Sequence, residues 1–285
     1  MFTPSDDINR ALRTAAHSPT LMLASDFDGC LAPLNKDAMA VTANPTAMNA
    51  VIDLAHMPHT FGALVSGRDI SKLERLARRT GPQGQNIADD GPDDVRDISG
   101  IILAGSHGAE ANDGSGVEPN EEQKKLLERM IREAHAVADS APHSGLFVEE
   151  KPLGVGLHGV AMNNDELERQ LQQKFADILD SLLNGTTGSY MYGKHILEAQ
   201  IMEVDKGKWL ESARDRYNVD AIVYAGDDTT DENAFRVLHG NDVSIKVGDS
   251  HTATVLRVPD TDAIADVYQR LATMRREYLT ENRVL

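Results

Sequence analysis

The chain has 285 residues, which is too long for one ordinary small domain and comfortable for two. A formal net charge of -17 argues against binding to nucleic acid or to an anionic membrane, since both need a basic face. A single cysteine excludes an intrachain disulfide framework, and with neither a signal-peptide pattern at MFTPSDDINR nor a membrane-length apolar run, we expect a cytoplasmic protein.

Short apolar runs alternate with helical patterns over the first part of the chain. Asn44 is a candidate N-cap for the first of these helices, and Asp69 lies near the start of the second. The Gly-, Pro- and Asp-rich stretch 80–100 predicts a loop. Strands are expected over residues 21–27, 61–66 and 101–105, and helices over 44–57 and 69–79. This alternation indicates parallel strands joined by crossover helices.

The pattern changes in the middle of the chain. A long charged helix, two strands, a second helix and a further strand fit a small α+β unit with an antiparallel sheet. These elements are expected over residues 121–139, 145–152, 154–162, 165–183 and 195–202. Because they interrupt the alternation, we interpret them as an insertion. The domains predicted are a first part of the core over 1–108, an inserted domain over 109–201 and a second part of the core over 202–285.

The alternation resumes after Lys206. The apolar runs AIVYAG, VSIKVG and ATVLRV predict strands, and the segments between and around them have helical spacing. Helices are expected over residues 206–217, 230–238 and 262–279, and strands over 221–226, 243–248 and 253–258.

Acidic and hydroxyl side chains follow three of the predicted parallel strands. Asp26 and Asp28 come after the first strand, Ser66 ends the second, and Asp227 follows the strand at 221–226. Ligands of open parallel sheets bind beyond the carboxyl ends of the strands, so these side chains are expected at one edge. Carboxylates gathered there repel one another unless a cation neutralises them, and oxygen ligands favour a hard divalent ion. The sequence therefore predicts a Mg²⁺ site.

Phosphate is the usual anion that completes the coordination shell of Mg²⁺. Ser66, the amides of the helix start after it, and Lys206 are candidates to hold phosphoryl oxygens. One carboxylate can attack phosphorus, and a second two residues away can transfer protons. Each motif alone has a plain explanation as a turn, a solvated lysine or a helix start capped by Thr230. All four together, in this order, point to phosphoryl transfer.

In these four motifs the chain resembles the phosphatases of the haloacid-dehalogenase (HAD) superfamily. The motifs are DFDGC at 26–30, Ser66, Lys206 and GDDTTDE at 226–232. Within the superfamily the chain resembles the trehalose-phosphatase family. That resemblance is carried by SGR at 66–68, GSHGAE at 105–110, EEK at 149–151 followed by His158, GK at 193–194, Glu198, DKG at 205–207 and GDDTTDENAF at 226–235.

The resemblance implies the fold class α/β, with a HAD-like Rossmannoid core containing a parallel sheet and an inserted α+β cap domain of the C2 type. It implies that Asp26 is the nucleophile and Asp28 the general acid and base. Mg²⁺ would be held by the Asp26 carboxylate, the Asp28 main-chain carbonyl and Asp227. Ser66 and Lys206 would complete the catalytic set by binding the phosphoryl oxygens.

The resemblance also implies a set of substrate-binding residues. The cap residues among them would bind sugar hydroxyls, and two acidic residues of the last motif, Asp228 and Asp231, would support the site. The substrate-binding set is Gly67, Arg68, His107, Glu149, Lys151, His158, Lys194 and Glu198.

The chain departs from the family pattern at three places. Cys30 stands where the family usually has Thr, which leaves the catalytic assignment intact and fits a small packing residue. Gly159–Val160 stands where the family commonly has Tyr-Arg, and Gln200–Ile201 where it has Arg-Pro. The last two departures remove basic or planar side chains near the expected sugar site.

We therefore expect a monomer that uses Mg²⁺ to hydrolyse a sugar phosphomonoester, with trehalose 6-phosphate as the first expectation. Other sugar phosphates, such as sucrose phosphate or a glucosyl-glycerol phosphate, remain open. So do a sugar phosphomutase of the same superfamily and a receiver-like phosphate-binding module without enzymatic activity. Release of free phosphate, formation of an isomer, or neither would separate these possibilities.

Overall fold

The computed structural model describes residues 2–37, 39–80 and 95–284, and it divides the chain into two compact units. One unit, the core unit, comprises Met1–Gly116 and Asp205–Leu285. The other, the inserted unit, comprises Val117–Val204. Among the described residues, no helix combines the length and the apolar run that a bilayer span requires.

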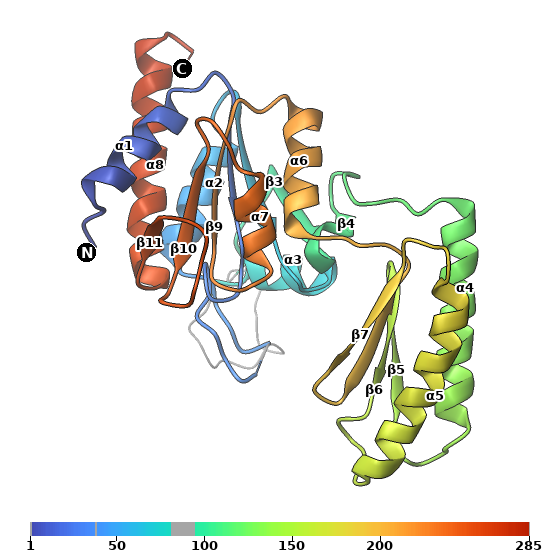
Figure 1. Ribbon diagram of the computed structural model, residues 1–285. Coiled ribbons are helices and arrows are strands. Elements are labelled where there is room, and N and C mark those ends of the chain that lie inside the picture. Colours follow the sequence, from blue (N-terminus) through green and yellow to red (C-terminus); the bar gives the residue numbers. More distant parts are fainter. Residues whose placement is uncertain (1, 38, 81–94, 285) are drawn as a thin grey trace. The chain divides into compact units, whose positions relative to one another are not determined.

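The core unit is built on a seven-stranded sheet with the order β11-β10-β9-β1-β2-β3-β4 (Figure 1). Its neighbours pair in parallel except β4, which pairs antiparallel with β3. The strands are β1 (Leu21–Ser25), β2 (Thr60–Val65), β3 (Ile101–Gly105), β4 (Glu110–Ala111), β9 (Ala221–Gly226), β10 (Val243–Val247) and β11 (Leu256–Val258). The chain thus enters the insertion from one edge of the sheet and returns near its centre.

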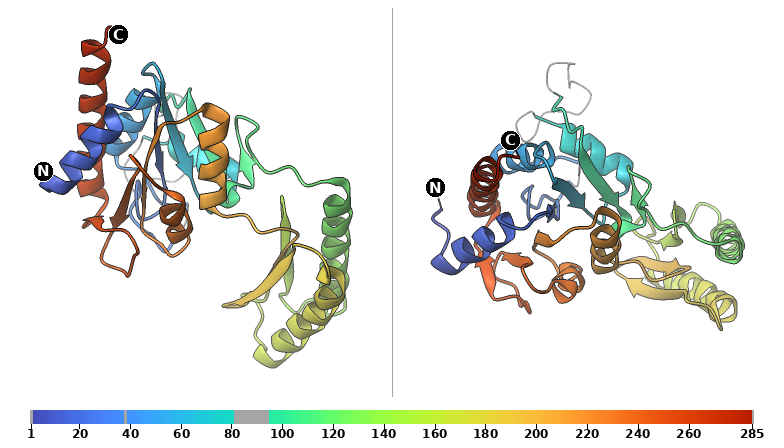
Figure 2. Two further views of the ribbon diagram at one scale, coloured as in Figure 1. Left: turned by 45° about the horizontal axis from the view of Figure 1, so that its top comes forward. Right: turned by 90° about the horizontal axis from the view of Figure 1, so that it is seen from above.

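Helices cover both faces of this sheet, as the two views of Figure 2 also show. The first-face helices are α1 (Asp6–Ala16), α2 (Pro45–Ala55), α3 (Ile70–Arg78) and α8 (Thr261–Glu281), and the second-face helices are α6 (Lys206–Tyr217) and α7 (Asp231–Val237). Strand β1 is buried throughout because its residues alternate between the two cores. Leu21 and Leu23 join the first, and Met22 and Ala24 the second.

Side-chain caps define where several of the core helices start. The carboxamide oxygen of Asn44 accepts hydrogen bonds from the amides of Thr46 and Ala47, and Asp69 accepts one from the amide of Lys72. Both caps agree with the expectation from the sequence. Thr230 occupies the N-cap position of α7 without a side-chain capping bond.

The inserted unit is a four-stranded antiparallel sheet with two helices on one face. The strand order is β5-β6-β8-β7, and within the described residues 117–204 the opposite face carries no helix of this unit (Figure 1). Its elements are α4 (Glu121–Asp139), β5 (Phe147–Lys151), β6 (Gly154–His158), α5 (Asp165–Leu183), β7 (Ser189–Gly193) and β8 (Ile196–Gln200). An antiparallel sheet with one open face leaves that face available for ligands.

Most predicted elements are confirmed with small shifts at their ends, and among the described residues one α-helix and two strands were missed. Helix α1 was not predicted although its polar and apolar residues have helical spacing. Strands β4 and β7 were also missed. Strand β4 has two residues and is defined by its pairing with β3, whereas β7 contains two tyrosines, a strand-favouring residue type, so its signal was present in the sequence. The pairing of β4 also keeps residues 109–116 in the core unit, so the first boundary lies later than predicted. The predicted loop at 80–100 lies largely outside the described residues.

Candidate active site

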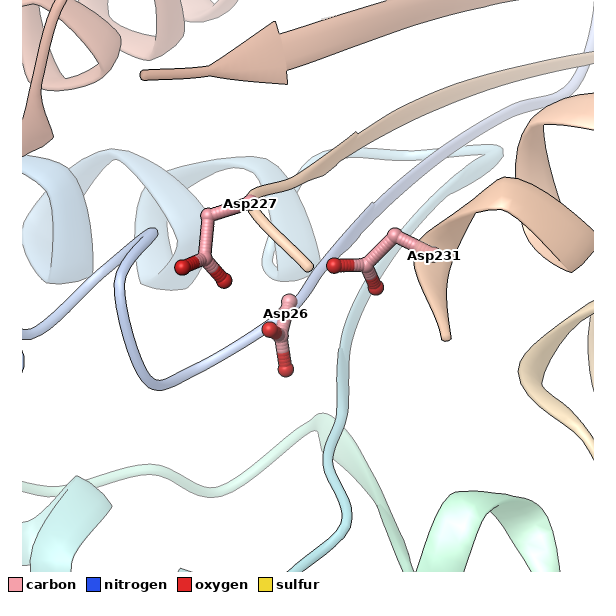
Figure 3. Close-up of side chains that lie close together, drawn as sticks. All are labelled: Asp26, Asp227 and Asp231. Carbon is pink, nitrogen blue, oxygen red and sulfur yellow. The ribbon is translucent and has the colours of Figure 1, made fainter. Parts of the chain in front are cut away.

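Three carboxyl groups converge beyond the carboxyl ends of β1 and β9. Asp26 follows β1, Asp227 follows β9, and Asp231 is the first residue of α7. Each offers an oxygen within 4.8 Å of the others, and Figure 3 shows the three side chains gathered together. The cluster forms because β1 and β9 are adjacent parallel strands, which brings their last residues side by side.

A buried lysine links two members of this cluster. Lys206 Nζ lies 2.8 Å from Asp26 Oδ1 and 2.7 Å from Asp231 Oδ1. Asp231 is fully buried and also accepts hydrogen bonds from the Tyr224 hydroxyl at 2.6 Å and from the Asp228 amide at 2.9 Å. These donors fix the Asp231 carboxylate in place, so that it orients Lys206 toward Asp26.

Burial and crowding of like charges shift the titration of the cluster. Burial raises the pKa of Asp26 to about 8, and Asp231 and Asp227 add to this while Lys206 opposes it. Burial together with the charge of Asp231 raises the pKa of Asp227 to about 6. Burial lowers the pKa of Lys206, but the carboxylates of Asp26 and Asp231 outweigh it and the net shift is upward. The cluster therefore has more negative charge than one lysine neutralises.

The donor set fits a hard divalent cation. All three cluster members offer carboxylate oxygens, the ligands that Mg²⁺ prefers. Gly29, with a φ of +73°, makes room for one of them: a Cβ built there would lie 2.0 Å from Asp227 Oδ2. A glycine at this position therefore lets the Asp227 carboxylate approach the main chain that follows Asp26.

The carboxylate of Asp28 pairs with Arg68 and is not one of the three carboxylates of the cluster. Arg68 binds it through both Nε and Nη2, so that both Asp28 oxygens accept a hydrogen bond. The third carboxylate in the cluster is instead Asp231, which the sequence indicated only as a supporting residue. Asp28 and Arg68 come from segments that follow the neighbouring strands β1 and β2, so the same sheet edge brings them together.

The residues after β2 and β3 form one hydrogen-bonded loop pair. The amides of Ser106 and His107 donate to the carbonyls of Arg68 and Ser66 at 2.7 and 2.8 Å. Both donors have positive φ, +50° and +59°, a strained backbone that clusters at functional sites. The His107 ring fills the space over Gly67, since a Cβ at that glycine would lie 2.7 Å from the ring.

Ser66 is nearly fully buried at this junction. Its hydroxyl oxygen accepts a hydrogen bond from the Arg68 amide at 3.2 Å. A serine turn of this kind orients the hydroxyl at the start of the segment that leads into α3.

A second hydrogen-bond chain supports Asp26 from inside the core. The Tyr268 hydroxyl of α8 donates to Ser25 Oγ at 2.8 Å, and Ser25 Oγ donates to the carbonyl of Asp26 at 2.8 Å. Cys30 Sγ lies 3.4 Å from the same Ser25 oxygen, and burial raises the pKa of its thiol. Cys30 is thus a buried polar packing residue behind the site.

The open face of the inserted sheet carries another polar cluster. Cross-strand register places Glu149, Gly156 and Glu198 in one row across β5, β6 and β8. Lys151 Nζ lies 2.7 Å from a Glu198 oxygen and 3.8 Å from a Glu149 oxygen. It reaches across β6 because Gly156, and Gly154 beside it, have no side chains. The centre of this face therefore consists of Gly154 and Gly156, here called the glycine floor, with charged side chains on both sides.

An aromatic pair closes one end of that floor. His158 Nε2 lies 2.9 Å from Glu149 Oε2, and Phe147 stacks on the His158 ring with centroids 4.7 Å apart and an interplanar angle of 3°. A Cβ built at Gly156 would lie 3.1 Å from His158 Nε2, so the imidazole extends over the floor. Carboxylates, an amine and aromatic surface side by side are the groups that recognise sugar hydroxyls and C–H faces.

The remaining two predicted residues are exposed. Lys194 lies in the turn between β7 and β8. The Asp228 carboxylate accepts a hydrogen bond from the Thr229 amide at 2.6 Å, while its own amide donates to Asp231. Two contributors were missed: Tyr224, which bonds Asp231, and Lys246, a buried lysine of β10. A polar residue inside an apolar strand, in AIVYAG and VSIKV, was the available signal.

Comparisons with known proteins agree with this architecture. The trehalose-phosphatase family model matches residues 86–262. A trehalose-phosphate phosphatase of Mycobacterium tuberculosis is 28% identical over 271 residues, covering 88% of this chain and 61% of its own length. A bifunctional trehalose-6-phosphate synthase/phosphatase of Thermoproteus tenax is 27% identical over 253 residues, covering 88% of this chain and 32% of its own length. The chain thus spans less than two thirds of the length of each of these relatives.

A solved structure shows the same fold. The trehalose-6-phosphate phosphatase of Aspergillus fumigatus superposes with a TM-score of 0.64 at 19% identity, covering 97% of this chain and 100% of that one. This likeness confirms the α/β fold class with a mostly parallel central sheet. Since the family model also matches more than half of the sequence, the chain belongs to the trehalose-phosphatase family.

Proposed function

We propose that the chain is a Mg²⁺-dependent sugar-phosphate phosphatase that hydrolyses trehalose 6-phosphate. The observation that carries the proposal is the buried cluster of Asp26, Asp227 and Asp231 with Lys206 on two of its members. Excess negative charge at the end of a parallel sheet suits a divalent cation and a phosphoryl group bound together.

Asp26 is the proposed nucleophile. Its Oδ1 accepts hydrogen bonds from the Phe27 amide at 2.8 Å and from Lys206 at 2.8 Å, which orient the carboxylate. A carboxylate oxygen attacks phosphorus, the bond from phosphorus to the sugar oxygen breaks, and an aspartyl-phosphate forms. Asp26 and Asp227 would hold Mg²⁺, which when bound supplies charge stabilisation for the phosphoryl oxygens.

Asp28 is the proposed proton carrier. It gives a proton to the departing sugar oxygen and later takes one from the water that attacks the aspartyl-phosphate, so that phosphate is released. Both Asp28 oxygens are bound by Arg68, and this pair must open for the proton transfer. The phosphate dianion is a natural competing partner for the Arg68 guanidinium.

The inserted unit is proposed as the cap that selects the sugar. Its support is the glycine floor flanked by Glu149, Lys151 and Glu198, with the Phe147–His158 pair at one end. A hydroxyl-rich disaccharide would take over the hydrogen bonds that Lys151 and Glu198 make with each other. Excluding water and recognising the leaving group are common roles of segments that cover an active site.

A different sugar phosphate is the second candidate. Gln200, in a position where the family commonly has Arg, faces the same side of β8 as Glu198 and pairs in register with Gly154. A neutral amide in place of an arginine leaves the binding face with one positive charge fewer, which suits a sugar phosphate other than trehalose 6-phosphate.

A phosphate-release screen with and without Mg²⁺ tests the proposed function. Trehalose 6-phosphate is expected to be hydrolysed well above sucrose 6-phosphate and glucose 6-phosphate, and chelation is expected to abolish turnover until Mg²⁺ is restored. If another sugar phosphate is hydrolysed faster, the proposed substrate is wrong and the proposed mechanism still stands. No release from any phosphomonoester would overturn both.

A further inference from the structure

Lys246 is a buried lysine that the proposed chemistry leaves unassigned. It lies near the carboxyl end of β10, next to β9, and its residue is 1% exposed. Its Nζ donates to the main-chain carbonyl of Asp227 at 2.6 Å and approaches that of Asp228 at 3.5 Å. Burying an ammonium group is costly unless its hydrogen bonds are satisfied, and here main-chain oxygens satisfy them.

The peptide that Lys246 binds is also held by neighbouring groups. Ser250 Oγ donates to the same Asp227 carbonyl at 3.4 Å. Glu232 Oε1 lies 4.0 Å from Lys246 Nζ, and Glu232 Oε2 accepts a hydrogen bond from the Ala253 amide at 2.9 Å. The segment after β9 is therefore tied to the segment after β10, with Lys246 in the centre.

The Asp227 side chain lies against Gly29. A Cβ at that position would lie 2.0 Å from Asp227 Oδ2, so the carboxylate occupies space that only a glycine leaves open. Lys246 holds the main chain of Asp227, and this glycine admits its side chain to the site. Residues that orient a metal ligand in this way typically change metal affinity by about 10-fold to 100-fold when replaced.

We propose that Lys246 is a positioning residue that holds the Asp227–Asp228 peptide so that the Asp227 carboxylate faces the cation. This inference rests on the proposed function, because that function places Mg²⁺ at Asp227. Lys246 touches neither substrate nor cation and acts through the main chain of the ligand.

A simple charge effect makes the opposite prediction. A lysine near a cation site repels the cation, so removing the lysine would strengthen Mg²⁺ binding by Coulomb's law. Loss of positioning would weaken binding instead. The sign of the change in affinity therefore distinguishes the two roles.

The experiment measures Mg²⁺ binding by isothermal titration calorimetry without substrate, and the Mg²⁺ dependence of phosphate release. Lys246→Met is expected to weaken Mg²⁺ binding about 10-fold or more. Turnover at saturating Mg²⁺ should stay within about threefold of the wild-type rate, since the nucleophile is untouched. Lys246→Arg, which keeps a cationic donor, is expected to restore most of the affinity.

Glu232→Gln is the matched control, because it removes the charge beside Lys246 and keeps the bonds from the lysine to the carbonyls. It is expected to change Mg²⁺ affinity by less than about threefold. Unchanged or tighter Mg²⁺ binding by Lys246→Met would overturn the proposal. If Lys246→Met does not fold, Mg²⁺ binding by Lys246→Gln is judged by the same criterion. If neither variant folds, Lys246 is needed for folding itself, and the proposal is overturned. Absence of Mg²⁺ binding by the wild-type protein would instead count against the proposed function.

Discussion

The two polar clusters of this protein differ in how their side chains are held. In the core unit, Asp26, Asp231 and Lys206 are buried and each is fixed by several hydrogen bonds. In the inserted unit, Glu149 and Glu198 are roughly two-fifths exposed; Glu198 contacts Lys151, and Glu149 contacts His158 and Lys151. A rigid, dry site stabilises a defined transition state, whereas a half-exposed face can exchange its own ion pairs for those of a ligand.

The largest expected effect concerns the core cluster alone. Asp26→Asn keeps the size of the side chain and removes the nucleophile, so turnover should fall by about 10³-fold or more. The loss should be equal for trehalose 6-phosphate and p-nitrophenyl phosphate, because both use the same nucleophile. Circular dichroism checks that the variant is folded. Near wild-type turnover on either substrate would remove Asp26 from the reaction.

A substitution on the inserted sheet should separate the two substrates. Glu198→Gln removes the charged acceptor on the glycine floor, and hydrogen bonds to charged groups contribute about 1.5–3 kcal/mol. Hydrolysis of trehalose 6-phosphate is therefore expected to fall about 10-fold or more in kcat/KM, with p-nitrophenyl phosphate nearly unaffected.

Glu150→Gln provides the control for that experiment. Glu150 belongs to the same sheet but lies on the helix-covered face, where His135 of α4 is 3.0 Å away. The Glu150→Gln variant should hydrolyse both substrates with an unchanged kcat/KM. An equal loss of kcat/KM for trehalose 6-phosphate in Glu198→Gln and Glu150→Gln would mean that the open face does not bind the sugar.

Filling the glycine floor should have a smaller but similar effect. In Gly156→Val the new side chain would meet His158 Nε2 and Ile196 Cδ1, which lie 3.1 and 3.3 Å from a Cβ at this position. The KM for trehalose 6-phosphate is expected to rise about 10-fold, since the blocked floor weakens ground-state and transition-state binding alike. Unchanged kinetics together with an unchanged melting temperature would show that the floor is not a binding surface.

The smallest expected effect is on stability and belongs to the core cluster. The pKa of Asp26 is raised from its ordinary value of 3.8 to about 8, so its contribution to stability is complete at acid pH and is lost as pH rises to about 8. The melting temperature of Mg²⁺-free wild type should therefore fall relative to Asp26→Asn between pH 5 and 9, by about 2–4 °C or more. Mg²⁺ should reverse this fall in the wild-type protein only. Parallel curves for the two proteins would contradict the burial of an excess carboxylate.

The sequence alone determined the alternation of elements, the α/β class and the four motifs. It could do so because strand and helix periods are local, and because parallel strands place whatever follows them at one edge. Asp26, Ser66 and Asp227 were found on that basis, and Lys206 was found from its place at a predicted helix start and its match to the family motif. Only the tertiary structure decided which acids meet: Asp231 joins the cluster, and Asp28 binds Arg68. It also decided that Lys246 holds the Asp227 carbonyl. Those outcomes depend on residues that come together only when neighbouring strands of the core sheet pair, and no local pattern encodes their partners and distances.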